Sequence, residues 1–158
     1  LMPIDLRVTV FWSSPDSIEY LREREEVRHE RLYAIVGRPG PGSRVEPVTF
    51  YIGQTRRHTS ARLGDRGHKF EQIVAAESNR YNVKVRVGRI DPGPGARVTA
   101  KLVGDIEALL IQTNEPRYNE QFPTPRSGTV ATITNLTEGG ARHVDEIADW
   151  SAPRRLSR

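Results

Sequence analysis

Cysteine is absent from this 158-residue sequence, and long apolar runs are absent too. Without cysteine the chain can form neither disulfides nor thiolate metal sites, which fits a reducing compartment, and we expect a cytoplasmic protein. No run of about eighteen or more apolar residues is present, so we expect no membrane span. The length and the apolar share of 36% predict one small domain with long loops rather than two full cores.

Lysine is scarce, and arginine carries almost all of the positive charge. Of the 24 basic residues only Lys69, Lys84 and Lys101 are lysine, and the net charge is +4 with an isoelectric point near 9.8. A guanidinium binds phosphate in a bidentate way and keeps its charge when partly desolvated, which favours a nucleic-acid partner. A GC-rich genome that favours arginine codons would produce the same bias.

Apolar periodicity predicts a compact core between residues 31 and 120. Strands are expected at 32–36, 48–52 and 83–90, and helices at 59–63, 69–78 and 98–113. Pro-Gly tracts at 39–42 and 92–95 predict a long hairpin loop and a turn into the last helix. The core is therefore expected to have the order β-β-α-α-β-α.

The segments outside this core are interpreted as additions to it. Residues 1–30 are expected to form an arm with a strand at 6–12, followed by a solvated helix or partly ordered segment at 18–30. Residues 121–158 are expected to form an extension with a strand at 129–134, a short helix at 141–150 and a basic tail.

The helix expected at 98–113 carries a carboxylate at the margin of its apolar face. At about 100° per residue, most of its apolar side chains fill an arc of roughly 140°, and Glu107 falls near 180°, before Ile111. A carboxylate in this position is costly unless it meets a cation or a metal ion. A salt bridge to an arginine, or a side chain that reaches water, would explain it as well.

A basic stretch follows the strand expected at 48–52. Its positive and histidine residues are Arg56, Arg57, His58, Arg62, Arg66, His68 and Lys69, against the single acid Asp65. A phosphodiester near this strand end would face dense positive charge. The other interpretation is a solvated basic surface.

Four elements of the sequence, taken in order, resemble the GIY-YIG nuclease family. Leu32-Tyr33 followed by Tyr51-Ile52-Gly53 is similar to its paired tyrosine signature. Arg62 lies eleven residues after Tyr51, where the family carries an arginine. Glu107 is similar to the metal-binding glutamate of the family's helix, and the segment that ends in Asn119 is similar to its closing segment. The resemblance covers roughly residues 31–120, the whole predicted core.

The sequence also departs from the family pattern at three places. The first tripeptide is Arg31-Leu32-Tyr33, without the leading glycine, and the two tyrosines lie eighteen residues apart because of the Pro-Gly loop. Arg66 stands where the family often has a histidine, and His68 follows two residues later. His68 is therefore either an active-site histidine or a surface one.

The resemblance implies an α+β fold with a central antiparallel three-stranded sheet flanked by helices. It also implies metal-dependent hydrolysis of DNA phosphodiester bonds, with Glu107 as the ligand of Mg²⁺ or Mn²⁺. Arg62 would stabilise negative charge on the phosphoryl oxygens. Tyr33 would act as the base while Tyr51 positions water or phosphate, and Asn119 would fix a strand backbone or the tyrosine geometry. The residues expected to contact nucleic acid are Arg56, Arg57, His58, Arg66 and Lys69.

The sequence thus predicts a DNA endonuclease of restriction-like or mobile-element type. Repair, recombination and toxin roles stay open, and paired cuts by a one-site enzyme would require a homodimer. The alternatives are a nucleic-acid-binding module that has the fold without the cleavage activity, and a toxin or RNase variant.

Overall fold

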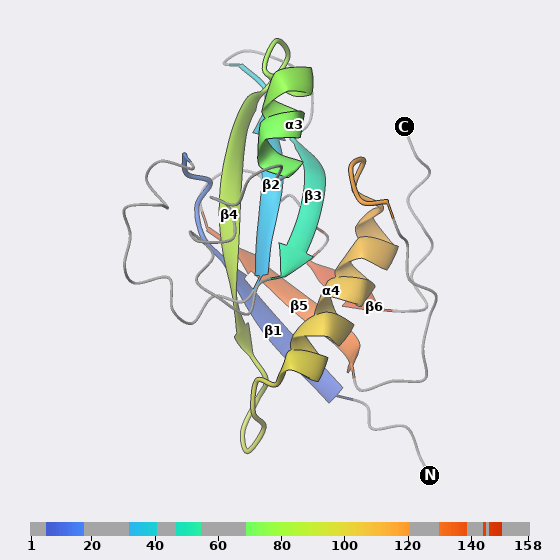
Figure 1. Ribbon diagram of the computed structural model, residues 1–158. Coiled ribbons are helices and arrows are strands. Elements are labelled where there is room, and N and C mark those ends of the chain that lie inside the picture. The colour runs from blue at the N-terminus through green and yellow to red at the C-terminus, as the bar shows by residue number, and fades with distance from the viewer. Residues whose placement is uncertain are drawn as a thin grey trace.

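The computed structural model describes residues 6–17, 32–40, 47–54, 69–120, 130–138, 144 and 146–149. These residues form one six-stranded sheet in the order β3-β2-β4-β1-β5-β6, with two helices (Figure 1). The elements are β1 (Leu6–Trp12), β2 (Leu32–Arg38), β3 (Val48–Gln54), α3 (Lys69–Glu77), β4 (Asn82–Asp91), α4 (Ala100–Asn114), β5 (Val130–Thr137) and β6 (Ile147–Asp149). Neighbouring strands are antiparallel except β1 and β5, which are parallel.

The α+β class predicted from the sequence is confirmed, but the sheet is not limited to three strands. The predicted core strands β2, β3 and β4 are adjacent and antiparallel. β1 then pairs with the other edge of β4, and β5 and β6 extend the sheet beyond β1. A strand edge has unpaired N–H and C=O groups that a further strand can satisfy. Strands from all three predicted segments, 1–30, 31–120 and 121–158, therefore share one sheet.

The element bounds agree with the periodicity in most places. The strands and helices expected near residues 6, 32, 48, 69, 83, 98 and 129 are all present with shifts of a few residues at their ends. The helix expected at 141–150 is wrong where it can be checked, because Ile147–Asp149 pairs with β5 as a strand. Strand pairing has overridden the local helical pattern there. The helices expected at 18–30 and 59–63 lie outside the described residues.

Alternate residues of β2 pack into two hydrophobic cores, one on each face of the sheet. Leu32, Ala34 and Val36 belong to the core that contains the apolar side chains of α4. Tyr33 and Ile35 belong to the core that contains those of α3. No helix in the described part of the chain is long and apolar enough to cross a bilayer.

A buried arginine connects the ends of β1 and β5. Arg86, on β4, is 2% exposed, and its Nη1 donates to the carbonyl oxygens of Ser13 at 2.7 Å and Glu138 at 2.5 Å. Burial, and then the nearby positive charge of Arg38, lower the pKa of Arg86 to about 10. The guanidinium therefore bonds the two segments that directly follow β1 and β5.

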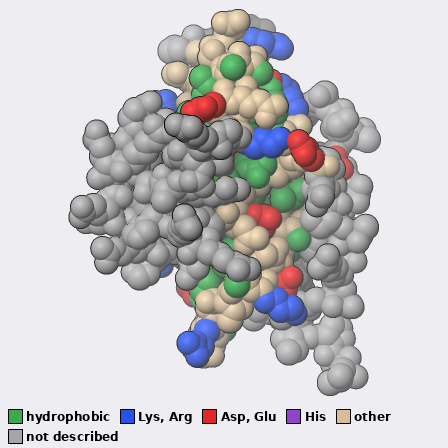
Figure 2. All heavy atoms as spheres, in the orientation of Figure 1, with side chains coloured by type: hydrophobic (Ala, Val, Ile, Leu, Met, Phe, Trp, Pro, Cys, Tyr) green, Lys and Arg blue, Asp and Glu red, His purple; other side chains and the backbone are tan. Residues whose placement is uncertain are grey.

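Basic side chains lie at both ends of the described surface (Figure 2). Arg80 is exposed just before β4 begins, and Arg97 is exposed in the loop after β4 ends. The middle of this view is occupied mainly by hydrophobic and uncharged side chains. On this face, Lys and Arg side chains therefore lie at both ends and also beside acidic side chains between them.

Candidate active site

Tyr33 and Tyr51 lie close together on neighbouring strands. In the antiparallel register of β2 and β3, Tyr33 is opposite Gly53 and Ile35 is opposite Tyr51, so the two tyrosines are diagonal neighbours on one face. Their ring centroids are 6.0 Å apart. Tyr33 is 1% exposed, whereas Tyr51 is partly exposed. The structure therefore brings the two predicted tyrosines together, with Tyr51 nearer to solvent.

Gly53 provides the space for the ring of Tyr33. A Cβ atom at position 53 would lie 2.5 Å from Cζ, 2.5 Å from Oη and 2.9 Å from Cε1 of Tyr33. Non-bonded carbon atoms pack at about 3.5 Å or more, so any side chain at this position would displace the ring. The glycine of Tyr51-Ile52-Gly53 is therefore required by a contact across the strand pair.

Asn119 binds the free edge of β3. Its Oδ1 accepts the N–H of Ile52 and its Nδ2 donates to the carbonyl oxygen of Ile52, both at 3.0 Å. The N–H of Tyr118 donates to the carbonyl oxygen of Phe50 at 2.8 Å. β3 is the edge strand of the described sheet, so these bonds satisfy backbone groups that none of the described strands pairs. Of the two tasks expected for Asn119, this contact corresponds to the fixing of a strand backbone.

Glu107 lies on the side of α4 that faces the end of β3. A Cβ atom at Gly104 would be 3.8 Å from Nε2 of Gln54, and residues three apart share one side of a helix. Glu107 is partly exposed and follows Ile106, which is fully buried. The marginal position expected from periodicity is confirmed. The two tyrosines belong to the core on the other face of the sheet, so the carboxylate and the phenols approach β3 from its two faces.

The described residues contain no group of three or more His, Cys, Asp or Glu side chains able to hold a metal ion. A cation at Glu107 would therefore have at most two such ligands from this part of the chain and would take others from water and substrate. Mg²⁺ accepts such a site, because it keeps several waters and often binds through one or two carboxylates plus phosphate oxygens.

Glu77 is a buried carboxylate near this site that the sequence does not single out, and it fixes the segment that carries Asn119. It is 7% exposed at the end of α3, and its Oε1 accepts hydrogen bonds from Nη1 of Arg117 and Oη of Tyr118, both at 2.9 Å. Desolvation, followed by the hydrogen bond to Glu77 and its charge, raises the pKa of Tyr118. The spacing of Phe70, Ile73 and Glu77 was the available signal, because it places a carboxylate on the buried side of the helix.

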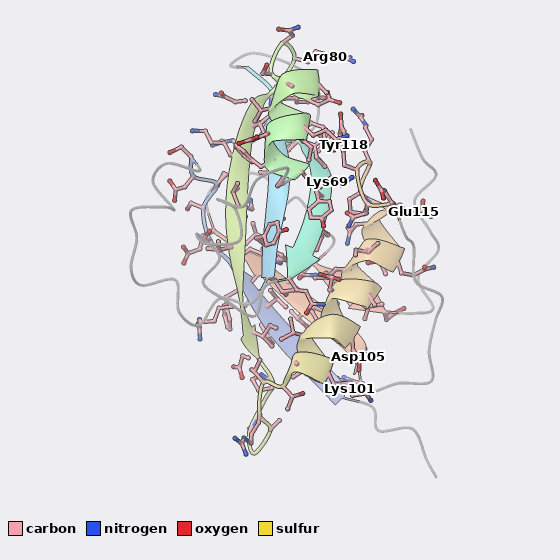
Figure 3. The ribbon with its side chains drawn as sticks, viewed as in Figure 1. Lys69, Arg80, Lys101, Asp105, Glu115 and Tyr118 are labelled. Atoms are coloured by element: carbon pink, nitrogen blue, oxygen red, sulfur yellow. The ribbon has the colours of Figure 1, made fainter. Side chains whose placement is uncertain are left out.

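Lys69, at the start of α3, bonds the last residue of the segment 117–120. Its Nζ donates to Oε1 of Glu120 at 2.8 Å, and this hydrogen bond, followed by the charge of Lys69, lowers the pKa of Glu120. Residues 117–120 are thus attached to both ends of α3 and to β3, and Figure 3 shows Lys69 and Tyr118 in this region. The ammonium group of Lys69 is thus paired with the carboxylate of Glu120. The other predicted basic and catalytic residues, Arg56, Arg57, His58, Arg62, Arg66 and His68, lie outside the described residues.

Comparison of the chain with protein-family models, with curated proteins and with solved structures found no match. A functional assignment must therefore depend on the residues themselves and on the geometry that the fold gives them.

Proposed function

We propose that this protein is a metal-dependent endonuclease of the GIY-YIG type that hydrolyses DNA phosphodiester bonds. The observation that carries the proposal is the tyrosine pair, with ring centroids 6.0 Å apart on adjacent antiparallel strands. The ring of Tyr33 packs directly on Gly53, so the glycine of the second signature has a physical role beside the tyrosine of the first. Two unrelated tyrosines in a sheet would not need a glycine opposite one of them.

The order of the elements also supports the proposal. β2 and β3 form a hairpin, α3 follows, β4 pairs with the other edge of β2, and α4 comes last among these elements. Asn119 then returns to β3 and bonds the residue between Tyr51 and Gly53. The family-like residues on β2, β3 and 116–119 therefore lie around one strand. α4, which carries Glu107, packs against the same strand, on the face of the sheet opposite to the two tyrosines.

Phosphodiester hydrolysis needs an activated water, neutralisation of charge at phosphorus and assistance to the leaving oxygen. In the proposed site Glu107 would hold a divalent cation, Mg²⁺ or Mn²⁺, which when bound would supply Lewis-acid stabilisation of the phosphoryl and leaving oxygens. Arg62 is proposed, from its place in the sequence, to stabilise the developing negative charge by charge-assisted hydrogen bonds. Asn119 positions β3, and through it Tyr51.

The exposure of the two tyrosines bears on which of them takes a proton from water. A free phenol has a pKa near 10, so only about one in a thousand is ionised at neutral pH, and its surroundings must assist it. The family resemblance assigns this role to Tyr33. Tyr51 is the more exposed of the two, which favours it as the phenol that contacts water. The assignments differ in a measurable way: the phenylalanine variant of the true base should lose the pH dependence of kcat, whereas the other variant should keep it.

The experiment that tests the proposal is cleavage of supercoiled plasmid by the purified protein in Mg²⁺, with Glu107→Gln and Asp105→Asn compared. Asp105 is a matched control because it lies on the same helix two residues earlier and is also partly exposed. We expect cleavage that EDTA abolishes, a loss of about 100-fold or more in Glu107→Gln, and little change in Asp105→Asn. Equal cutting by both variants would show that Glu107 is not the ligand.

The same assay separates the alternative functions. A wild-type protein that binds DNA but leaves every plasmid intact would be a binding module. Degradation of RNA with duplex DNA spared would indicate the RNase variant. Sequencing the ends of cut DNA then distinguishes discrete target sites from general cleavage.

A further inference from the structure

The loop between β4 and α4 has a defined shape and projects from one end of the sheet (Figure 1). Oδ1 of Asp91 accepts the N–H of Gly93 at 2.9 Å, and the carbonyl oxygen of Gly93 accepts the N–H of Ala96 at 3.3 Å. Gly93 and Gly95 have φ values of 92° and 75°, a region that glycine enters without strain. Local hydrogen bonds and glycine conformation, rather than burial, therefore shape residues 92–99.

Positive charge dominates this loop and its two flanks. Arg89, Arg97 and Lys101 are all exposed, and Asp91 is the single acid in the sequence between positions 88 and 101. The carboxylate of Asp91 is already used by the turn. The next acid, Asp105, is one helical turn beyond Lys101 and is partly buried; both are labelled in Figure 3. The loop thus presents cations to solvent with little local compensation.

The cations lie on both sides of the loop. Ile90 packs in the core with α4, so its neighbour Arg89 points to the opposite face, where its guanidinium lies 4.8 Å from the ring centroid of Phe11. Lys101 is in the first turn of α4, on the other side of the sheet. Arg97 is in the loop itself. A polyanion with charge along two parallel rims would meet a cation at each rim and one between them.

We propose that this loop is a DNA-contacting element that enters a groove of duplex DNA, with Arg89 and Lys101 on the phosphates at its two rims. The inference rests on the proposed function, because it takes DNA as the substrate of this protein. The major groove of B-form DNA is about 12 Å wide and bordered by phosphates on both sides, whereas the major groove of A-form RNA is deep and narrow and excludes protein side chains. A preformed loop with cations on both flanks therefore fits duplex DNA better than duplex RNA.

The loop and Glu107 are connected by the first half of α4. Six residues separate Lys101 from Glu107 on α4, a rise of about 9 Å at 1.5 Å per residue. The loop is thus close, along α4, to the carboxylate proposed to bind metal.

The test is binding of a fluorescent duplex in EDTA, where no strand is cut, measured by anisotropy over a range of salt concentrations. The variant Arg89→Ala/Lys101→Ala is compared with Arg38→Ala/Arg80→Ala. The control pair also removes two exposed positive charges. Arg38 and Arg80 lie where β2 ends and β4 begins, at the end of β4 that is farther from the loop. All four side chains are exposed, so both variants should fold like the wild type, and circular dichroism checks this.

We expect the loop variant to bind duplex DNA about tenfold more weakly, with the slope of log K against log salt reduced by about 2, because two phosphate contacts are lost. The control pair should change affinity by less than about twofold, and a duplex RNA of the same sequence should bind more weakly than the DNA. Equal affinities for the two variants, tighter binding of RNA, or no binding of duplex DNA by the wild type would each overturn the inference. If the wild type cleaves plasmid and the loop variant binds DNA as tightly as the wild type, only this inference is overturned. If the loop variant binds DNA more weakly but the wild type cleaves no plasmid, only the proposed nuclease activity is overturned.

Discussion

Replacing Gly53 with alanine tests the contact between β3 and the ring of Tyr33. The added methyl group would lie 2.5 Å from both Cζ and Oη of Tyr33. Because atoms in contact prefer about 3.5 Å, the ring must move by about 1 Å. Tyr33 is 1% exposed in a packed core, where such a shift costs about 1 to 3 kcal/mol of unfolding free energy. Alanine also restricts the unfolded chain, which offsets about 0.5 to 1 kcal/mol of this cost. We therefore expect the unfolding free energy to fall by about 1 to 2 kcal/mol.

The cleavage rate should fall much more than the stability. A displacement of about 1 Å at a reacting group can lower a rate about 100-fold. A domain with an unfolding free energy of about 5 to 15 kcal/mol remains folded after losing about 2 kcal/mol, so unfolding would not explain the lost activity. Urea unfolding followed by tryptophan fluorescence measures the stability, because Trp12 is 1% exposed and would enter water. Plasmid nicking in Mg²⁺ measures the rate.

Gly104→Ala is the matched control for this experiment. A Cβ atom at Gly104 has Nε2 of Gln54 as its nearest neighbour, at 3.8 Å, which is an ordinary contact. The substitution lies in the middle of α4, where it should stabilise the protein by about 0.5 to 1 kcal/mol and leave cleavage within about twofold of wild type. A Gly53→Ala protein as stable and as active as Gly104→Ala would refute the role given to the Tyr33 contact.

Three other predictions follow from buried polar contacts. Asn119→Ala removes both hydrogen bonds to Ile52 and should lower the unfolding free energy by about 2 to 3 kcal/mol in urea; a change below about 0.5 kcal/mol would contradict the contact. Desolvation and the bond to Glu77 raise the pKa of Tyr118 above its unfolded value near 10, so this contribution to stability is fully present below about pH 10 and is lost as pH rises through the folded pKa. In a spectrophotometric titration, Tyr118→Phe should remove a late-titrating phenol, and an unchanged titration curve would count against the shift. Arg86→Lys should lose about 1 to 3 kcal/mol, measured by thermal unfolding, because the shorter lysine side chain does not place its ammonium group where Nη1 bonds both carbonyl oxygens; full stability in this variant would argue that those bonds contribute nothing.

Local patterns in the sequence were sufficient to predict most elements and the place of one acid. Val83, Val85 and Val87 alternate as a strand, and β4 covers all three. The apolar spacing of the last predicted helix put Glu107 at the edge of the buried face, where it lies. Such features repeat every two or about 3.6 residues, so a short window of sequence contains them.

Contacts between distant residues could not be predicted in this way. The carboxylate of Glu77 bonds Tyr118, 41 residues away, and the amide of Asn119 bonds Ile52, 67 residues away. Each partner taken alone has an ordinary polar side chain, and no period relates the two positions. The resemblance to the nuclease family indicated that Asn119 and Gly53 are important, but the strand edge and the tyrosine ring that require them became visible only in the fold.

The parallel pairing of β1 with β5 has a consequence for how the protein is made. Nε1 of Trp12 donates to Oδ1 of Asn135, 123 residues away, and the whole of β1 pairs with β5. During synthesis the β1 segment is made well before β5, so its second edge stays uncovered until the β5 segment has also been made. Contacts of such long sequence separation form slowly, and an uncovered strand edge promotes aggregation. We therefore expect the yield of native protein to depend on temperature and chaperones during expression, and expect residues 31–120 alone to aggregate through the bare edge of β4.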